Sequence, residues 1–145
     1  MKIQCDFCYH HCTLDEGQSG ICSVRTREQG RIVTKAYGNL VALAVDPVEK
    51  KPLYHFLSGS KTLSLAMPGC NLACSFCQNY PISQSSYHQH QGGESVDAPL
   101  LVSLAFERNC PSISFTYSEP LVWQDYMLEV ASLAKSKGLS TIMVT

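Results

Sequence analysis

The sequence lacks an excess of charge of either sign and has no long apolar run. Its 145 residues carry 11 Lys and Arg against 12 Asp and Glu, so the composition gives no sign of nucleic acid or of an anionic membrane as a partner. The apolar runs are far shorter than a membrane span requires, and residues 1–5 lack the apolar core of a signal peptide. With 45% hydrophobic residues, the composition predicts a cytoplasmic globular protein with one core.

Cysteine, by contrast, is abundant, and three of the 8 cysteines stand close together. In a reducing compartment, cysteines in such number argue for metal binding rather than for disulfides. Cys70, Cys74 and Cys77 form a C-x3-C-x2-C pattern directly after a mostly apolar run, residues 63–67, which predicts a buried strand. Three thiolates at this spacing can hold three irons of an iron–sulfur cube and leave the fourth iron without a protein ligand. An open metal position can bind and activate a substrate. The alternative is a zinc knuckle or a plain ferredoxin-type loop.

Residues 1–30 contain four further cysteines in a segment with little apolar material. They are Cys5, Cys8, Cys12 and Cys22. A structural metal can replace the missing hydrophobic burial, and both zinc and a second iron–sulfur cluster suit four thiolates. The alternatives are four unrelated thiols, or a thioredoxin-like pair at Cys5 and Cys8. His10 and His11 lie among these cysteines, where such side chains are more often solvated or hydrogen-bonded to a ligand than ligands themselves.

The remaining pattern predicts an α/β fold. Residues 31–46 suggest a hairpin with its turn at Gly38-Asn39, and residues 46–56 suggest a proline-bearing connector in which we expect His55 to be packed or hydrogen-bonded. Strands are predicted at residues 61–67, 112–117 and 139–145, and helices from Asp97 to about residue 109 and at residues 121–137. The polar stretch 78–93, including His88 and His90, suggests a solvated loop. Because the order is βαβαβ, we expect a right-handed parallel sheet.

An acidic residue follows the second predicted core strand, in the run Tyr117-Ser118-Glu119-Pro120. A carboxylate at the carboxyl end of a parallel strand can accept hydrogen bonds from an ammonium group above the sheet. The alternative is that Glu119 complements the dipole of the following helix as a first-turn acid.

At these residues the chain resembles the radical S-adenosylmethionine (SAM) superfamily, whose signature is C-x3-C-x-aromatic-C. Within it, Cys70 to Asn79, residues 46–56 and Tyr117 to Pro120 look like the AmmeMemoRadiSam-system radical SAM enzymes, relatives of pyruvate formate-lyase activating enzymes. The resemblance implies a [4Fe–4S] cluster on Cys70, Cys74 and Cys77. It also implies a SAM site at Phe76, Asn79, Tyr117 and Glu119, with Phe76 against the adenine and Glu119 at the amino group. Gly92-Gly93-Glu94 matches a family motif literally, but its place after a polar loop marks it as a decoy.

The resemblance further implies an activity and a fold. Reductive cleavage of SAM would give a 5′-deoxyadenosyl radical that abstracts hydrogen from a substrate, with a protein glycine as a candidate, and with an electron donor such as flavodoxin or ferredoxin. The fold would be the first half of a partial (β/α)6 barrel at residues 61–145, after a cysteine-rich metal-binding segment (1–30) and a hairpin with connector (31–60). Because residues 139–145 predict a strand that simply stops, we expect an N-terminal fragment of a longer protein. The alternative function is a non-catalytic metal-binding or electron-transfer module, in which zinc on the three cysteines takes His88 or His90 as its fourth ligand.

Overall fold

The centre of the protein is a four-stranded sheet, as a computed structural model that describes residues 1–85 and 95–145 shows. The strands are β5 (Ala42–Pro47), β6 (Lys61–Ala66), β7 (Ser112–Phe115) and β8 (Ser140–Met143), and they lie side by side in this order. β6, β7 and β8 are parallel, whereas β5 is antiparallel to β6. The predicted parallel βαβαβ unit is therefore present, and an antiparallel edge strand extends it.

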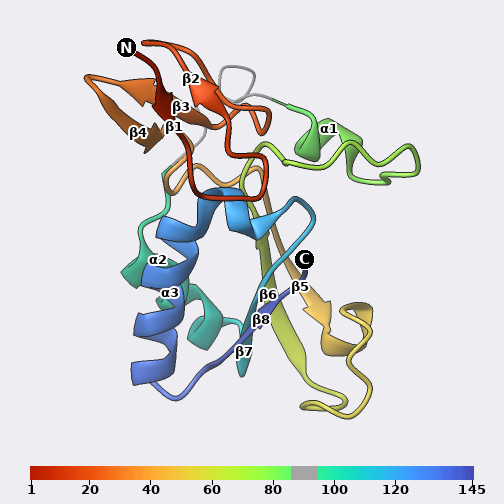
Figure 1. The fold of residues 1–145 in the computed structure, drawn as a ribbon. Helices are drawn as coiled ribbons and strands as arrows, with labels where there is room; N and C mark the ends of the chain where they lie inside the picture. The colour runs from red at the N-terminus through yellow and green to blue at the C-terminus, as the bar shows by residue number, and fades with distance from the viewer. Residues whose placement is uncertain (86–94) are drawn as a thin grey trace.

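Two helices cover one face of this sheet (Figure 1). They are α2 (Ala98–Glu107) and α3 (Gln124–Ser136). Strand residues alternate between the two faces of a sheet, and Leu63, Leu65, Ile113 and Phe115 point to the helices, where all four are buried in the hydrophobic core. Trp123 joins the same core and is fully buried, as expected of a packing residue.

The ends of both helices follow from local chemistry. The Asp97 side chain accepts a hydrogen bond from the Leu100 backbone N–H at 2.8 Å and so caps α2, and Pro99 lies in the first turn, where its missing N–H costs nothing. Beyond α3, Gly138 has a φ of 81°, a left-handed conformation that glycine adopts without strain. A 3-10 helix, η3 (Pro120–Trp123), precedes α3, so the α-helix begins three residues later than predicted.

The opposite face of the sheet is lined by small hydroxyl side chains. Thr62, Ser64, Ser112 and Ser114 alternate with the core residues of β6 and β7, and all four are buried. The hydroxyl groups of Thr62 and Ser114 form a hydrogen bond, with 2.7 Å between their oxygens. This face is therefore polar although it is shielded from water, which suits a surface that faces a ligand site rather than a second apolar layer.

The N-terminal segment forms two small antiparallel sheets at the end of the main sheet where β6 and β7 finish (Figure 1). One pairs β1 (Ile3–Gln4) with β2 (Thr13–Leu14), and the other pairs β3 (Arg25–Glu28) with β4 (Arg31–Thr34). The hairpin predicted at residues 31–46 is wrong in its pairing, because β4 pairs with β3 and not with residues 42–47. The turn of the observed hairpin is Gln29-Gly30, both at positive φ, and two-residue turns of this kind suit a hairpin. Residues 42–47 instead form β5, paired with β6.

Two further predictions differ from the structure. The polar stretch after the three cysteines, predicted as a loop, contains a one-turn helix, α1 (Tyr80–Ser83). The connector, predicted without regular structure, includes a short 3-10 helix, η1 (Val48–Lys50), that is compatible with this prediction. His55 is exposed rather than packed. His88, His90 and Gly92-Gly93-Glu94 lie outside the described residues. Within the described ranges, no helix combines the length and the apolar character needed to cross a bilayer.

Candidate functional site

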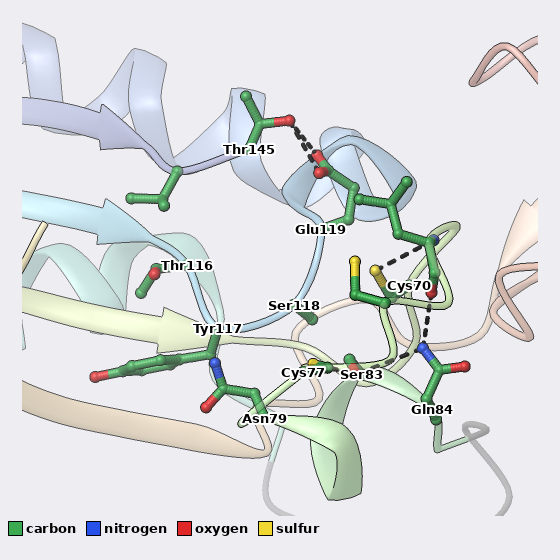
Figure 2. A pocket seen from close by; sticks show the side chains of 13 residues that line it. Cys70, Cys77, Asn79, Ser83, Gln84, Thr116, Tyr117, Ser118, Glu119 and Thr145 are labelled. Atoms are coloured by element: carbon green, nitrogen blue, oxygen red, sulfur yellow. Dashed lines mark hydrogen bonds between the residues drawn. The ribbon is translucent and has the colours of Figure 1, made fainter.

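A cavity of about 230 Å³ lies beyond the carboxyl ends of β6, β7 and β8. Its lining residues come from the loop after β6, from α1 and from the ends of β7 and β8; they are Cys70, Leu72, Cys74, Cys77, Asn79, Ser83, Gln84, Thr116, Tyr117, Ser118, Glu119, Val144 and Thr145. Figure 2 shows the side chains of Cys70, Cys77 and Glu119 around this cavity, with Glu119 beside Thr145 and Cys77 beside Ser83. The carboxyl ends of parallel strands are the usual place for a ligand in an open α/β sheet.

The loop that carries the cysteines turns sharply out of β6 at Gly69. The φ of Gly69 is 88°, and a Cβ there would lie 2.4 Å from the carbonyl oxygen of Cys22 and 2.7 Å from a methyl carbon of Val24. Only glycine fits this approach. The next residue, Cys70, has its sulfur 3.4 Å from the backbone nitrogen of Leu72, which donates a hydrogen bond to it.

The short helix α1 supports the third cysteine. The Cys77 sulfur lies 3.3 Å from the hydroxyl oxygen of Ser83, which is 3% exposed. Gln84, directly after α1, donates a hydrogen bond of 2.8 Å to the carbonyl oxygen of Leu72. The turn between Cys74 and Cys77 is closed by a backbone hydrogen bond of 3.2 Å. The loop is thus held at both ends by its own hydrogen bonds.

The three thiols suit an iron–sulfur cluster in chemistry and in access. Cys74 is exposed, and Cys70 and Cys77 are half-buried, so all three can be reached from the cavity. Burial is the largest influence on the Cys70 thiol and raises its pKa, and the neighbouring Glu119 charge also raises it; a metal would displace the proton on binding. In residues 1–85 and 95–145 no three or more Cys, His, Asp or Glu side chains are gathered closely enough to hold a metal ion as they stand. The ligands of a four-iron cube bind separate irons, so they stand further apart than the ligands of one ion.

Glu119 is buried, at 6% exposure, and lines the same cavity. Its carboxylate accepts a hydrogen bond of 3.1 Å from the Leu121 backbone N–H, and the Thr145 hydroxyl donates to it at 2.9 Å from each oxygen. Glu119 therefore caps η3, as the alternative interpretation expects of an acid at a helix start. A carboxylate has about four acceptor positions, so this role leaves capacity for an ammonium group in the cavity.

Tyr117 departs from the alternation of its strand. Ile113 and Phe115 face the helices, and the next residue in that series would do the same, but the φ of Tyr117 is 67°, and its ring turns away from the cysteines, back along the sheet (Figure 2). There its hydroxyl donates a hydrogen bond to the carboxylate of Asp46. Tyr117 and Asn79 are nevertheless both among the residues that line the cavity.

The structure does not bring every predicted site residue together. Phe76 is 86% exposed and is not part of the cavity lining. The remaining cysteine, Cys110, does not line the cavity; its thiol is buried at 2% exposure, and burial raises its pKa. Sequence reasoning missed Ser83 and Gln84, because nothing marked α1 as an ordered support in a polar stretch.

The N-terminal cysteines lie near one another and close to the loop of the cavity. Burial raises the pKa of Cys5, and Cys22, Cys12 and Cys8 also raise it through their charges, so the four thiols share one neighbourhood. In the same segment, His10 has its ring nitrogen 2.7 Å from the carbonyl oxygen of Asn71. This histidine therefore links the cysteine-rich segment to the loop that carries Cys70.

Comparison with known proteins identifies the part of the chain that builds the cavity. Residues 64–145, more than half of the chain, match the family described as the Radical SAM superfamily. An uncharacterized protein of Methanocaldococcus jannaschii is 38% identical over 144 residues, which is 99% of this chain and 43% of that protein. The chain thus spans less than half the length of this relative. No solved structure matches the chain significantly.

Proposed function

Because the chain belongs to the radical SAM superfamily, in which a [4Fe–4S] cluster and SAM act together, we propose that its cavity binds both and supports hydrogen abstraction from a substrate. The observation that supports this most directly is the joint lining of one cavity by Cys70, Cys74, Cys77 and Glu119. When bound, the cluster and SAM together supply an electron and a radical that can take hydrogen from an unactivated carbon.

The protein's own residues hold and shield these groups in the proposal. Cys70, Cys74 and Cys77 would each hold one iron of the cluster and would leave the fourth iron without a protein ligand. The buried carboxylate of Glu119 accepts hydrogen bonds from the amino group of SAM, since a charge-assisted hydrogen bond in a shielded site is strong. The chain fixes the position of that carboxylate through Leu121 and Thr145.

The finer assignment is an activase-like enzyme, similar to pyruvate formate-lyase activating enzymes, that takes electrons from a donor such as flavodoxin or ferredoxin. Its support is the resemblance of residues 46–56, 70–79 and 117–120, and it makes a protein glycine one candidate substrate. Asn79 and Tyr117 contribute to the SAM site in this proposal because they line the same cavity. Phe76 would meet the adenine only if the loop moves, because its side chain is 86% exposed.

For residues 1–30 we propose a second metal site, zinc or iron–sulfur, on Cys5, Cys8, Cys12 and Cys22. Its support is the shared neighbourhood of the four thiols together with the scarcity of apolar material in this segment. In the structure, which describes all four, no three of these thiols stand close enough to hold one ion, so their side chains would have to converge when a metal binds. A metal here would stabilise the segment on which the loop after β6 rests. Metal analysis of a variant that lacks Cys5 and Cys8 tests this assignment. The zinc or iron content per chain should be lower in this variant than in the unmodified chain, and equal metal contents would contradict the second site.

Electron paramagnetic resonance (EPR) tests the proposed function. The chain is purified without oxygen, reconstituted with iron and sulfide, reduced with dithionite and measured with and without SAM. We expect a [4Fe–4S] signal that shifts when SAM is added, because SAM reaches the open iron. Cys74→Ala should abolish that signal, and Glu119→Gln should weaken the SAM-induced shift.

Cys110→Ala is the matched control, since it removes a cysteine that does not line the cavity, and it should keep the SAM-responsive signal. The variant without Cys5 and Cys8 should keep it as well. A chain that takes up zinc on Cys70, Cys74 and Cys77 and shows no reducible cluster would contradict the radical assignment and favour a non-catalytic metal-binding or electron-transfer module.

A further inference from the structure

A second pocket adjoins the cavity on the polar face of the sheet. It measures about 290 Å³ and is lined by Lys50, Lys51, Gln78, Asn79, Thr116 and Tyr117. We name it the lysine pocket. Asn79, Thr116 and Tyr117 also line the cavity of the three cysteines, so the two spaces share a wall. A ligand held at the lysines can therefore extend toward the place where the proposed chemistry occurs.

One carboxylate organises the two lysines. The ammonium groups of Lys50 and Lys51 each donate a hydrogen bond of 2.8 Å to Asp46, one to each of its oxygens, and Tyr117 also donates to Asp46. The Lys51 ammonium lies 4.7 Å and the Lys50 ammonium 5.8 Å from the centre of the Tyr117 ring, within the range of cation–π attraction. The side chains are thereby fixed in position before any ligand binds.

The cluster of Asp46, Lys50 and Lys51 carries two positive charges against one negative charge. With Asp46 ionised and both lysines protonated, one net positive charge remains. The Lys51 side chain is only 2% exposed, and an ammonium group withdrawn from water is costly unless its charge is compensated. The hydrogen bond to Asp46 uses one of the three donors of each ammonium. The Lys50 side chain, at 56% exposure, is accessible to a ligand from solution.

The charge and the size of the pocket define the ligand chemistry. One net positive charge matches a monoanion better than a dianionic phosphate group. Gln78, Asn79 and Thr116 line the same pocket, and an amide or hydroxyl side chain can donate a hydrogen bond to a carboxylate oxygen. The volume is at the lower end of the range for small-molecule sites, which suits a small acid or one acidic group of a larger molecule.

We propose that the lysine pocket binds the carboxylate of the substrate from which hydrogen is taken. This inference rests on the proposed function, because it assigns the ligand as the substrate of the neighbouring cavity. Lys50 and Lys51 bind the carboxylate, and Asp46 and Tyr117 position the two lysines. The pocket thereby selects substrates that carry an acid group close to the reacting carbon.

The test is a titration of the nitrogen-15-labelled chain with sodium acetate, followed by nuclear magnetic resonance (NMR) of the side-chain amides of Gln78 and Asn79. Sodium chloride at equal ionic strength is the blank. We expect saturable shifts with acetate that chloride does not produce. Lys50→Met should weaken acetate binding at least about tenfold through the loss of one charge-assisted hydrogen bond, and Lys50→Arg should retain binding.

Lys2→Met is the matched control. Like Lys50, Lys2 is a half-exposed lysine: its side chain is 59% exposed, and its ammonium group forms an ion pair with Asp15 at 3.1 Å. Lys2 does not line the lysine pocket. The Lys2→Met variant should bind acetate as the unmodified chain does. The backbone amide signals in the same NMR spectra show whether each variant is folded. Equal acetate affinity with and without the Lys50 ammonium would overturn the inference. Binding of inorganic phosphate ten times tighter than acetate would also overturn it, since the site would then select dianions.

A second arm identifies the source of the carboxylate. A blocked Gly-Asp-Gly peptide that binds more tightly than acetate would support an acidic protein segment as the substrate, and equal binding would support a small acid. Cys74→Ala should leave acetate binding unchanged. A SAM-responsive EPR signal without acetate binding would overturn this inference alone. Acetate binding without that signal would overturn the proposed function, and the assignment of the anion as substrate would fail with it.

Discussion

At the scale of single residues, Asp46 is the carboxylate that accepts hydrogen bonds from Lys50, Lys51 and Tyr117. Its side chain is 8% exposed, and burial by itself would raise the pKa of its carboxyl. Hydrogen bonds from Lys50, Lys51 and Tyr117 outweigh burial and hold that pKa well below its usual range. The same hydrogen bond and burial raise the pKa of Tyr117, burial being the larger cause, so the phenol stays protonated and keeps donating to Asp46.

Asp46→Asn should therefore destabilise the fold. The substitution preserves shape but leaves the ammonium of Lys51 buried without its counter-charge, and breaking a buried pair in this way costs about 3–5 kcal/mol. Chemical denaturation measures the loss in the free energy of unfolding. Lys51→Met added to Asp46→Asn should recover most of the loss, because it removes the uncompensated charge. A loss below about 1 kcal/mol for Asp46→Asn, in the range of an exposed pair, would contradict the buried ion pair.

The same comparison has a defined pH dependence. Because the pKa of Asp46 in the folded state lies below its ordinary value of 3.8, its contribution to stability is complete above that pH and is lost as the pH falls through the folded-state pKa. The difference in unfolding free energy between the unmodified chain and Asp46→Asn should therefore be constant near neutral pH and shrink in acid. A difference in unfolding free energy that grows in acid would mean that folding raises the pKa of Asp46 instead of lowering it.

At the scale of elements, Gly69 connects β6 to the loop with the cysteines and lets the N-terminal segment approach. Gly69→Ala would place a Cβ 2.4 Å from the Cys22 carbonyl oxygen and would also strain a backbone φ of 88°. Gly138→Ala is the control: its φ of 81° is similar, but a Cβ would meet nothing within 4 Å. Gly138→Ala should cost about 1–2 kcal/mol, the expense of a left-handed alanine, and Gly69→Ala should cost clearly more in the same denaturation experiment. Equal losses would mean that the contact with Cys22 does not constrain the loop.

Elements whose signals are local could be predicted from the sequence. The cap at Asp97 and the stop at Gly138 each depend on neighbours within a few residues, and the alternation in residues 112–115 identifies a strand directly. The hairpin turn could not be assigned so simply, because Gln29-Gly30 and Gly38-Asn39 are similar as turn signals. Gly38 instead lies against Ser95 and Val96: the Val96 N–H donates to its carbonyl oxygen at 2.9 Å. A contact across so many residues leaves no local mark.

The same distinction separates the parts of the site. The three cysteines and Glu119 lie in short motifs, and the structure places all four around one cavity. The group of Asp46, Lys50 and Lys51 meets Tyr117 only because β5 pairs with β6, and that pairing was not predicted. The reversed direction of the Tyr117 ring depends on a positive φ that tyrosine seldom adopts, so no pattern announces it.

At the scale of the whole molecule, a single arginine fastens the cysteine-rich segment to the core. Arg25 is 2% exposed, its Nε donates a hydrogen bond of 2.7 Å to the Val122 carbonyl oxygen, and it forms an ion pair with Asp125. Its guanidinium carbon also lies 3.7 Å from the centre of the Phe7 ring. Phe7 belongs to the segment, whereas Val122 and Asp125 belong to η3 and α3, so one planar group joins both parts.

Arg25→Lys should loosen this junction although it keeps the charge. An ammonium group cannot donate in two fixed directions and stack on a ring at the same time, so the hydrogen bond to Val122 or the contact with Phe7 is lost. Because the segment also touches the cysteine loop through His10 and Asn71, hydrogen exchange measured by mass spectrometry should quicken both in residues 5–24 and in residues 69–72. Arg31→Lys, at an exposed position of β4, should leave exchange in both stretches unchanged. Faster exchange in residues 5–24 alone would mean that the cysteine loop holds its conformation independently of the N-terminal segment, and that the two cysteine sites are not mechanically coupled.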